Sequence, residues 1–156
     1  MSQFRFEKHR VPADLTLVTG ATVAGFFFVA GSLANHNRPE RVGDLLNAET
    51  GFFPFERNDG TTALYNRSHV VMVALPSSSG EAEADPAYEF ARRRAVNMVL
   101  STGSCVSGTV AIYRPTGRDR LSDYARSDEL FRYVVTSGRT LIVNATHIVE
   151  LNEIAD

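Results

Sequence analysis

The chain of 156 residues is poor in the residue types that build covalent or metal-stabilised folds. A single cysteine, Cys105, excludes an intramolecular disulfide and any cysteine-based metal site. The histidines do not have the spacing of zinc ligands, so neither a metal nor a cofactor is predicted. The histidines are His9, His36, His69 and His147.

Long apolar runs and a strong net charge are also missing. The longest apolar stretch, residues 25–30, is far too short to span a bilayer, and the charged N-terminal residues lack the apolar segment of a secretory signal. The sequence therefore predicts a cytoplasmic protein that does not enter a membrane. The formal net charge of -2 gives no global attraction to nucleic acid, so an RNA site would have to be a local patch. A hydrophobic content of 44% is sufficient for a folded core.

What the sequence does contain is an internal repeat of three blocks in the same order. Residues 18–25 (VTGATVAG) recur as residues 101–108 (STGSCVSG), residues 40–45 (ERVGDL) recur as 119–124 (DRLSDY), and residues 65–71 (YNRSHVV) recur as 143–149 (VNATHIV). The first block lies 83 residues before its copy, and the second block lies 79 residues before its copy. The first copy therefore has four extra residues between these blocks, in the loop 31–37. The order and spacing of the blocks predict a tandem duplication.

Each copy has the pattern of a small β module. Apolar alternation around a Thr-Gly turn predicts a hairpin, with second strands at 22–30 and 105–113. A short helix should follow, with Gly43 or Ser122 as its N-cap. Three further strands are predicted in each copy, at 52–56, 63–66 and 70–75 in the first and at 130–136, 140–144 and 148–151 in the second.

The two copies are separated by an acidic stretch rich in Ser, Gly and Pro. This composition predicts a flexible linker, and residues 87–94 after it can form a short helix. The predicted organisation is a first β module at 14–76, a linker with its short helix at 77–94, and a second β module at 95–156. Whether the two modules are tethered or packed together stays open.

The glycine pattern of the hairpin together with the Asn-x-x-His-Ile block resembles the Sm-like barrel of LSm and Hfq proteins. Residues 99–110 are similar to the family's first hairpin, and residues 143–149 to its last strand pair. The helix block and the Asn-x-x-His-Ile block are also similar to repeats in uncharacterised bacterial proteins. The resemblance implies a mostly β fold with short helices, made of two tandem Sm-like β-barrel or β-sheet modules related by internal duplication.

Two patterns suggest enzymes, and neither has the right context. Residues 17–25 look like the glycine-rich start of a dehydrogenase, but the β-type run that follows favours tight-turn glycines. Cys105 with His147 could form a nucleophile and base, but the first copy has Thr22 at the cysteine position, which favours a small buried thiol. We therefore predict that the chain is not an enzyme.

The candidate binding residues come from the repeated polar motifs and from the aromatic strands. Asn and His of the repeated tetrad would either close a corner between strands or form a ligand site, and the arginines of the helix block would either cap the helix or face a partner. Phenylalanines that point outward would mark an interface. The candidates are Asn66, His69, Asn144, His147, Arg41, Arg120, Phe26 and Phe28.

These observations favour a non-enzymatic binding or assembly protein that mediates oligomerisation or protein–protein interaction. Open sheet edges can pair between subunits, so a homo-oligomer is expected. The first copy should pack against the second through Phe26, Phe28, Phe53 and Phe55. The alternative function is an Sm-like RNA-binding protein, which would use the tetrad residues together with Arg67 and Arg139.

Overall fold

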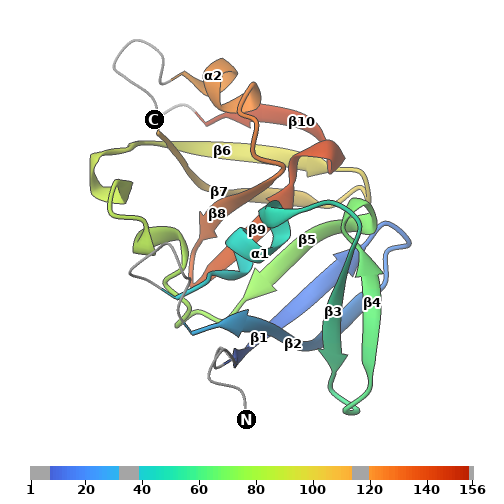
Figure 1. Cartoon of the computed structure of the whole chain (residues 1–156). Helices are drawn as coiled ribbons and strands as arrows, with labels where there is room; N and C mark the ends of the chain where they lie inside the picture. Colours follow the sequence, from blue (N-terminus) through green and yellow to red (C-terminus); the bar gives the residue numbers. More distant parts are fainter. Residues whose placement is uncertain (1–7, 32–38, 114–119, 155–156) are drawn as a thin grey trace.

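The computed structural model describes residues 8–31, 39–113 and 120–154, and in them the chain is mostly β. Ten strands form one antiparallel sheet in the order β10-β6-β7-β8-β9-β5-β1-β2-β3-β4 (Figure 1). The strands are β1 (Lys8–Leu17), β2 (Thr22–Ala30), β3 (Phe52–Arg57), β4 (Thr62–Asn66), β5 (Val70–Leu75), β6 (Arg92–Leu100), β7 (Cys105–Ile112), β8 (Phe131–Thr136), β9 (Arg139–Asn144) and β10 (Ile148–Glu153). The predicted extra loop residues 32–37 lie outside the described part.

The first half of the chain (β1–β5) and the second half (β6–β10) have the same strand order. In the first half the order is β5-β1-β2-β3-β4, and in the second it is β10-β6-β7-β8-β9. Both halves also carry the same irregularity. The register of β1 on β5 shifts between Thr16 and Leu17, and the register of β6 on β10 shifts between Val99 and Leu100. Residue-by-residue correspondence between the halves can therefore be read from the strand pairing.

The Thr-Gly turns close the two predicted hairpins. Gly20 and Gly103 have φ values of 88° and 90°, in the region that residues with a Cβ rarely adopt. They join β1 to β2 and β6 to β7 over long antiparallel ladders. The tight-turn interpretation of these glycines is confirmed, because each lies between two strands and not before a helix.

The second glycine of each repeat lies where two strands cross closely. A Cβ at Gly25 would overlap the carbonyl oxygen of Glu56, and a Cβ at Gly108 would lie 2.7 Å from the carbonyl oxygen of Val135. Because β2 pairs with β3, and β7 with β8, over only one or two residues, the sheet bends sharply there. Glycine at these two positions allows each half to curl around its own core.

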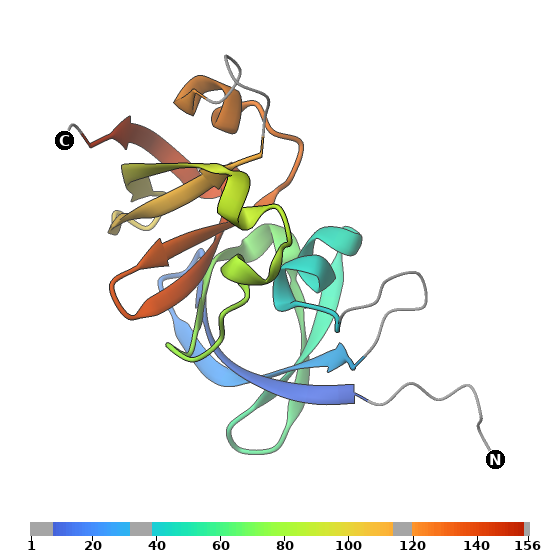
Figure 2. The same cartoon turned by 90° about the vertical axis from the view of Figure 1, so that its left-hand side faces the viewer.

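The two halves of the sheet curl separately, as Figure 2 shows. Two apolar clusters form the core, one centred in each half. The first contains Phe27, Phe53 and Phe55 with residues from β1 and β5. The second contains Met98 of β6, Val110 of β7 and Val71 of β5, and Ile148 and Leu151 of β10 pack against it. Phe131 and Ile142 belong to the second half of the sequence, yet they are buried in the first cluster.

Three sequence-based expectations need correction. The two modules are not separate barrels, because all ten strands form one sheet, which is not closed and ends at β10 and β4. Residues 87–94 do not form one helix: a single 3-10 turn, Tyr88–Phe90, is followed by β6 from Arg92. The helix N-caps are Arg41 and Arg120, ahead of α1 (Val42–Ala48) and α2 (Leu121–Ala125).

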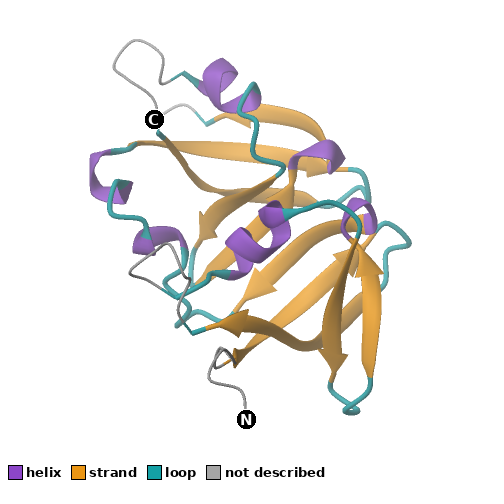
Figure 3. Cartoon of the chain, in the orientation of Figure 1, coloured by secondary structure: helices purple, strands orange, loops and turns teal. Residues whose placement is uncertain are grey.

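The short helices lie at the ends of strands and not in a separate layer (Figure 3). The segment between the halves is partly buried: Glu81 and Ala82 are buried at the start of the 3-10 turn Ala82–Ala84. No helix in the described ranges is long and apolar enough to cross a membrane.

Candidate functional site at the junction of the two halves

The two halves meet where β9 of the second half pairs with β5 of the first. Four residue pairs, from Met72 opposite Val143 to Leu75 opposite Thr140, join the strands. Phe131 and Ile142 project from β8 and β9 into the first-half core, where their exposed fractions are 1% and 0%. The junction therefore combines a continuous strand ladder with two apolar side chains from the second half.

The repeated tetrad of the second half lies in this junction. The Asn144 side chain is fully buried, and its Nδ2 donates to the carbonyl oxygens of Val70 (3.0 Å) and Arg67 (3.3 Å). The His147 ring also contacts the first half, with Nε2 2.8 Å from the Ser68 carbonyl oxygen. Since a carbonyl can only accept, Nε2 carries the proton, and Nδ1 accepts from the Ser101 hydroxyl at 2.9 Å. Asn144 and His147 thus bind the two halves together.

The tetrad of the first half has the same local structure at the free edge of the sheet. Asn66 Oδ1 accepts from the backbone nitrogen of Ser68 at 3.0 Å, as Asn144 Oδ1 does from that of Thr146. β4, which ends at Asn66, is the last strand of the sheet, and His69 is exposed. The structure therefore brings together Asn144, His147 and the first-half backbone, and it leaves Asn66 and His69 at an edge that no strand of the described residues covers.

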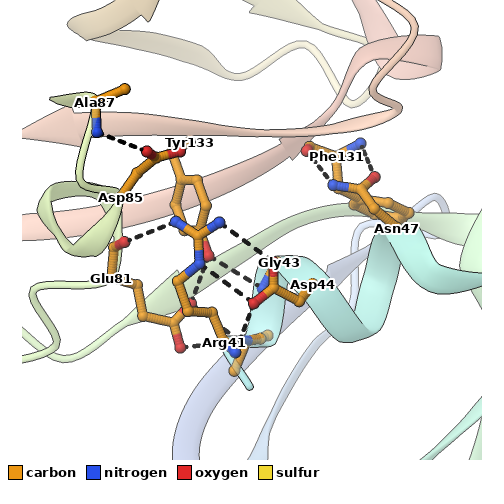
Figure 4. Close-up of polar contacts among 10 residues, drawn as sticks. Arg41, Gly43, Asp44, Asn47, Glu81, Asp85, Ala87, Phe131 and Tyr133 are labelled. Carbon is orange, nitrogen blue, oxygen red and sulfur yellow. Dashed lines mark hydrogen bonds and ion pairs between the residues drawn. The ribbon is translucent and has the colours of Figure 1, made fainter. Parts of the chain in front are cut away.

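The two predicted arginines lie at the starts of the short helices. The Asp44 carboxylate accepts from the Arg41 backbone nitrogen at 2.9 Å, and the Asp123 carboxylate accepts from that of Arg120 at 3.0 Å. Arg41 also forms an ion pair with Asp44 at 3.2 Å. Its Nη1 donates to the carbonyl oxygen of Glu81 at 3.2 Å, so Arg41 connects α1 to the segment between the halves (Figure 4).

A buried carboxylate that the sequence analysis missed completes this network. Glu81 accepts from the Val42 backbone nitrogen at 2.9 and 3.0 Å and from the Tyr133 hydroxyl at 2.7 Å. The Tyr133 hydroxyl accepts in turn from the Gly43 nitrogen at 3.2 Å. Burial raises the pKa of Glu81, and the hydrogen bonds and Arg41 oppose that shift. Its place in an acidic stretch resembling a linker gave no sign of this role.

The raised pKa of Glu81 predicts a specific pH dependence of stability. Because the folded-state pKa lies above that of the unfolded chain, ionisation costs more in the folded protein, and stability falls as pH rises through the folded pKa. The advantage in unfolding free energy of the wild type over Glu81→Gln should therefore shrink as pH rises. Urea denaturation of both proteins from about pH 4 to about pH 7 measures this.

Glu83→Gln is the control, since Glu83 is an exposed carboxylate in the same segment and its removal changes the net charge equally. If the wild type and Glu81→Gln differ by the same free energy at every pH, Glu81 is not the titrating group.

The aromatic residues do not join the halves as the sequence suggested. Phe53 and Phe55 are buried in the first-half core, in the same cluster as Phe131 and Ile142 of the second half, so their assignment to an outward-facing surface is wrong. Phe26 and Phe28 are half-buried on the other face of β2, and the Arg10 guanidinium stacks over the Phe26 ring at 4.1 Å. The aromatic side chains that do cross the junction are Phe131 and Tyr133.

Phe131 is also held through its backbone. Its nitrogen donates to Asn47 Oδ1 at 2.9 Å, and its carbonyl oxygen accepts from Asn47 Nδ2 at 2.8 Å (Figure 4). Asn47 belongs to α1, so the helix of the first half fixes the start of β8. Little in the sequence indicated the contact between Asn47 and Phe131, because Asn47 is not repeated: the residue at its position in the second half is Arg126.

A separate cavity of about 230 Å³ lies beside β7, β8 and α2, with Tyr113, Tyr124 and Tyr133 in its wall. Burial raises the pKa of Tyr113 and of Tyr124 to about 12, so both hydroxyls are weaker acids than an ordinary tyrosine and stay protonated near neutral pH. Arg132 donates to the carbonyl oxygens of Ser127 (2.8 Å) and Glu129 (2.7 Å) and thereby closes the end of α2. The cavity thus presents aromatic rings and protonated hydroxyls, which do not form a nucleophile with its base.

The remaining predicted chemistry is placed as follows. Cys105 is exposed at the start of β7, so the expectation of a buried thiol is wrong. Within the described ranges, no group of three or more His, Cys, Asp or Glu residues could hold a metal ion.

No protein-family model matches the chain, and no curated protein or solved structure is significantly similar to it.

Proposed function

We propose that this chain is a non-enzymatic assembly protein, built from two Sm-like β modules related by internal duplication, that binds a protein partner through the free β3–β4 edge. The shared strand order and the shared register shift of the two halves support the duplication. The exposed free cysteine favours a reducing compartment, which supports a cytoplasmic location.

The observation that carries the proposal is a pair of exposed apolar side chains on that edge. Phe52 and Leu64 have exposed fractions of 60% and 67%. Strand pairing aligns them with Phe131 and Ile142, because Phe52 lies opposite Asn66 as Phe131 lies opposite Asn144. The second-half residues are buried in the junction, whereas their first-half counterparts are uncovered. An uncovered sheet edge with large apolar side chains is typical of a protein-binding surface.

The RNA-binding alternative receives less support from the same contacts. Asn144 and His147, which would contact bases, are engaged with the first half, and Arg67 is buried with its guanidinium donating to the carbonyl oxygens of Leu45 and Leu46. These groups stabilise the protein itself, so we favour assembly over RNA recognition.

Site-specific photo-crosslinking tests the proposal. A benzophenone amino acid at position 52 or 64, expressed in the native host, should give a discrete crosslinked protein product on irradiation. The same substitution at Phe90, an exposed phenylalanine (83%) in the segment between the halves, is the matched control and should give none. The absence of a product at 52 and 64, or an identical product at 90, would contradict a binding role for this edge.

A further inference from the structure

The junction inside the chain shows how the outer face of β8 and β9 is received. Phe131 and Ile142 lie in one cluster with Leu46 of α1 and with Val70 and Val73 of β5. The receiving surface is therefore a helix end beside the fifth strand of a half. In the second half the equivalent elements are β10 and α2. If they are uncovered, they could receive the outer face of β3 and β4, which is the first-half counterpart of β8 and β9.

The second half has such an uncovered surface, and it is hollow. A cavity of about 200 Å³ lies between α2 and β10, with Ala125, Ile148, Val149 and Leu151 among its lining residues. Strand pairing and the helix alignment match these residues to Leu46, Val70, Val71 and Val73 of the first half. The hollow thus corresponds to the place where Phe131 and Ile142 are buried in the first half.

The cavity is open because small residues replace large ones. Ala125 is the counterpart of Leu46, and Ala145, which also lines the cavity, is the counterpart of Arg67. In the first half the buried Arg67 guanidinium fills this space and donates to carbonyl oxygens of α1. Arg132 also lines the cavity, but its guanidinium is held by the carbonyl oxygens of Ser127 and Glu129. With alanine at the two other positions, an aromatic ring from outside can enter beside it.

We propose that the protein partner of the β3–β4 edge is a second copy of this chain, whose β10 pairs with β4 and whose α2–β10 cavity receives Phe52. This inference rests on the function proposed above. Transferring the internal register places Leu64 opposite Leu151 and Thr62 opposite Glu153. The same register places Glu150 opposite Tyr65.

The resulting contact is head to tail, because it joins two different surfaces of the chain. It is weaker than the internal junction. The internal junction is formed within one chain, which raises the effective concentration of its two surfaces. Pro54 also replaces Tyr133 in the pairing, so the hydrogen bond to Glu81 has no counterpart. We therefore expect concentration-dependent assembly in the range of about 1 to 100 μM.

Sedimentation of the full-length chain with surface variants tests this inference. Phe52→Asp removes the inserted ring, and Ala125→Arg fills the cavity; both residues are exposed, so the fold should persist, and circular dichroism checks that it does. Each variant should weaken assembly at least about tenfold. Phe90→Asp, which places the same charge on an exposed phenylalanine elsewhere, should assemble like the wild type.

Mixing the two variants distinguishes head-to-tail pairing from other arrangements. Phe52→Asp keeps an intact cavity and Ala125→Arg keeps an intact Phe52, so the mixture should form a 1:1 dimer that neither protein forms alone. The dimer cannot grow further, because its two outer surfaces are both blocked.

The outcomes separate this inference from the proposed function. A wild type that stays monomeric up to about 1 mM, or a mixture that does not form the dimer, overturns the head-to-tail inference. A photo-crosslinked product with a different protein would then leave the proposed function standing. Assembly that persists unchanged in Phe52→Asp also overturns the head-to-tail inference, because self-assembly would then use another surface; the crosslinking result at 52 and 64 decides separately on the proposed function.

Discussion

Replacing Phe131 by alanine should lower the free energy of unfolding by about 3–5 kcal/mol, the usual cost of deleting a buried phenylalanine ring. The ring has an exposed fraction of 1% and lies in the first-half core, although it belongs to the second half of the sequence. Its backbone is held by Asn47, so the strand cannot shift freely to fill the space. The substitution should therefore weaken both the core and the contact between the halves.

The matched control is Phe52→Ala at the corresponding position. Phe52 is exposed in the isolated chain, so its removal should change stability by no more than about 0.5 kcal/mol. Both variants are compared with the wild type by urea denaturation at a protein concentration low enough to keep the chain monomeric, because assembly would add to apparent stability. Equal losses in the two variants would contradict the different burial of these two rings.

Local sequence patterns predicted most elements of the sheet, but not the start of β6, which begins at Arg92 inside the segment expected to be a short helix. Alternation with a Thr-Gly turn located β2 at the residues where it occurs, and the turn glycines have the positive φ that this assignment needs. The corner between the fourth and fifth strands was also predicted from the Asn-x-x-His block. All of these features are encoded within a few residues, where periodicity and turn preferences act directly.

The pairing of β5 with β9 could not be predicted in this way, because no local rule links strands so far apart in the sequence. A signal was nevertheless present. Residues 141–143 are three consecutive buried apolar residues, whereas the corresponding residues of β4 are not buried. A continuous apolar run indicates a strand covered on both faces. Both copies have such a run in the sequence, Leu-Ile-Val at 141–143 and Ala-Leu-Tyr at 63–65, so the run indicated a buried strand but not which of the two lies inside the molecule.

The wrong assignment of Phe53 and Phe55 arose from a slip of one residue between the copies. An alignment that keeps the 78-residue spacing of the repeated tetrad matches Phe131 with Phe53, whereas strand pairing matches it with Phe52. The turn after β3 is longer in the first half than the turn after β8, which hid the change of spacing. Because side chains alternate between faces, a slip of one residue exchanges the core face for the outer face.

Replacing Asn144 by alanine should lower the free energy of unfolding by about 2–3 kcal/mol. The fully buried side chain donates to the carbonyl oxygens of Arg67 and Val70, and it accepts from the Thr146 nitrogen. Asn66→Ala removes only the local bond of the same turn, from Ser68, and should cost no more than about 1 kcal/mol. The difference between the two losses, measured by urea denaturation, isolates the bonds that cross between the halves. Similar losses at both positions would show that Asn144 only closes its own turn, and the junction would then depend on apolar packing, strand pairing and the hydrogen bonds of His147 and Asn47.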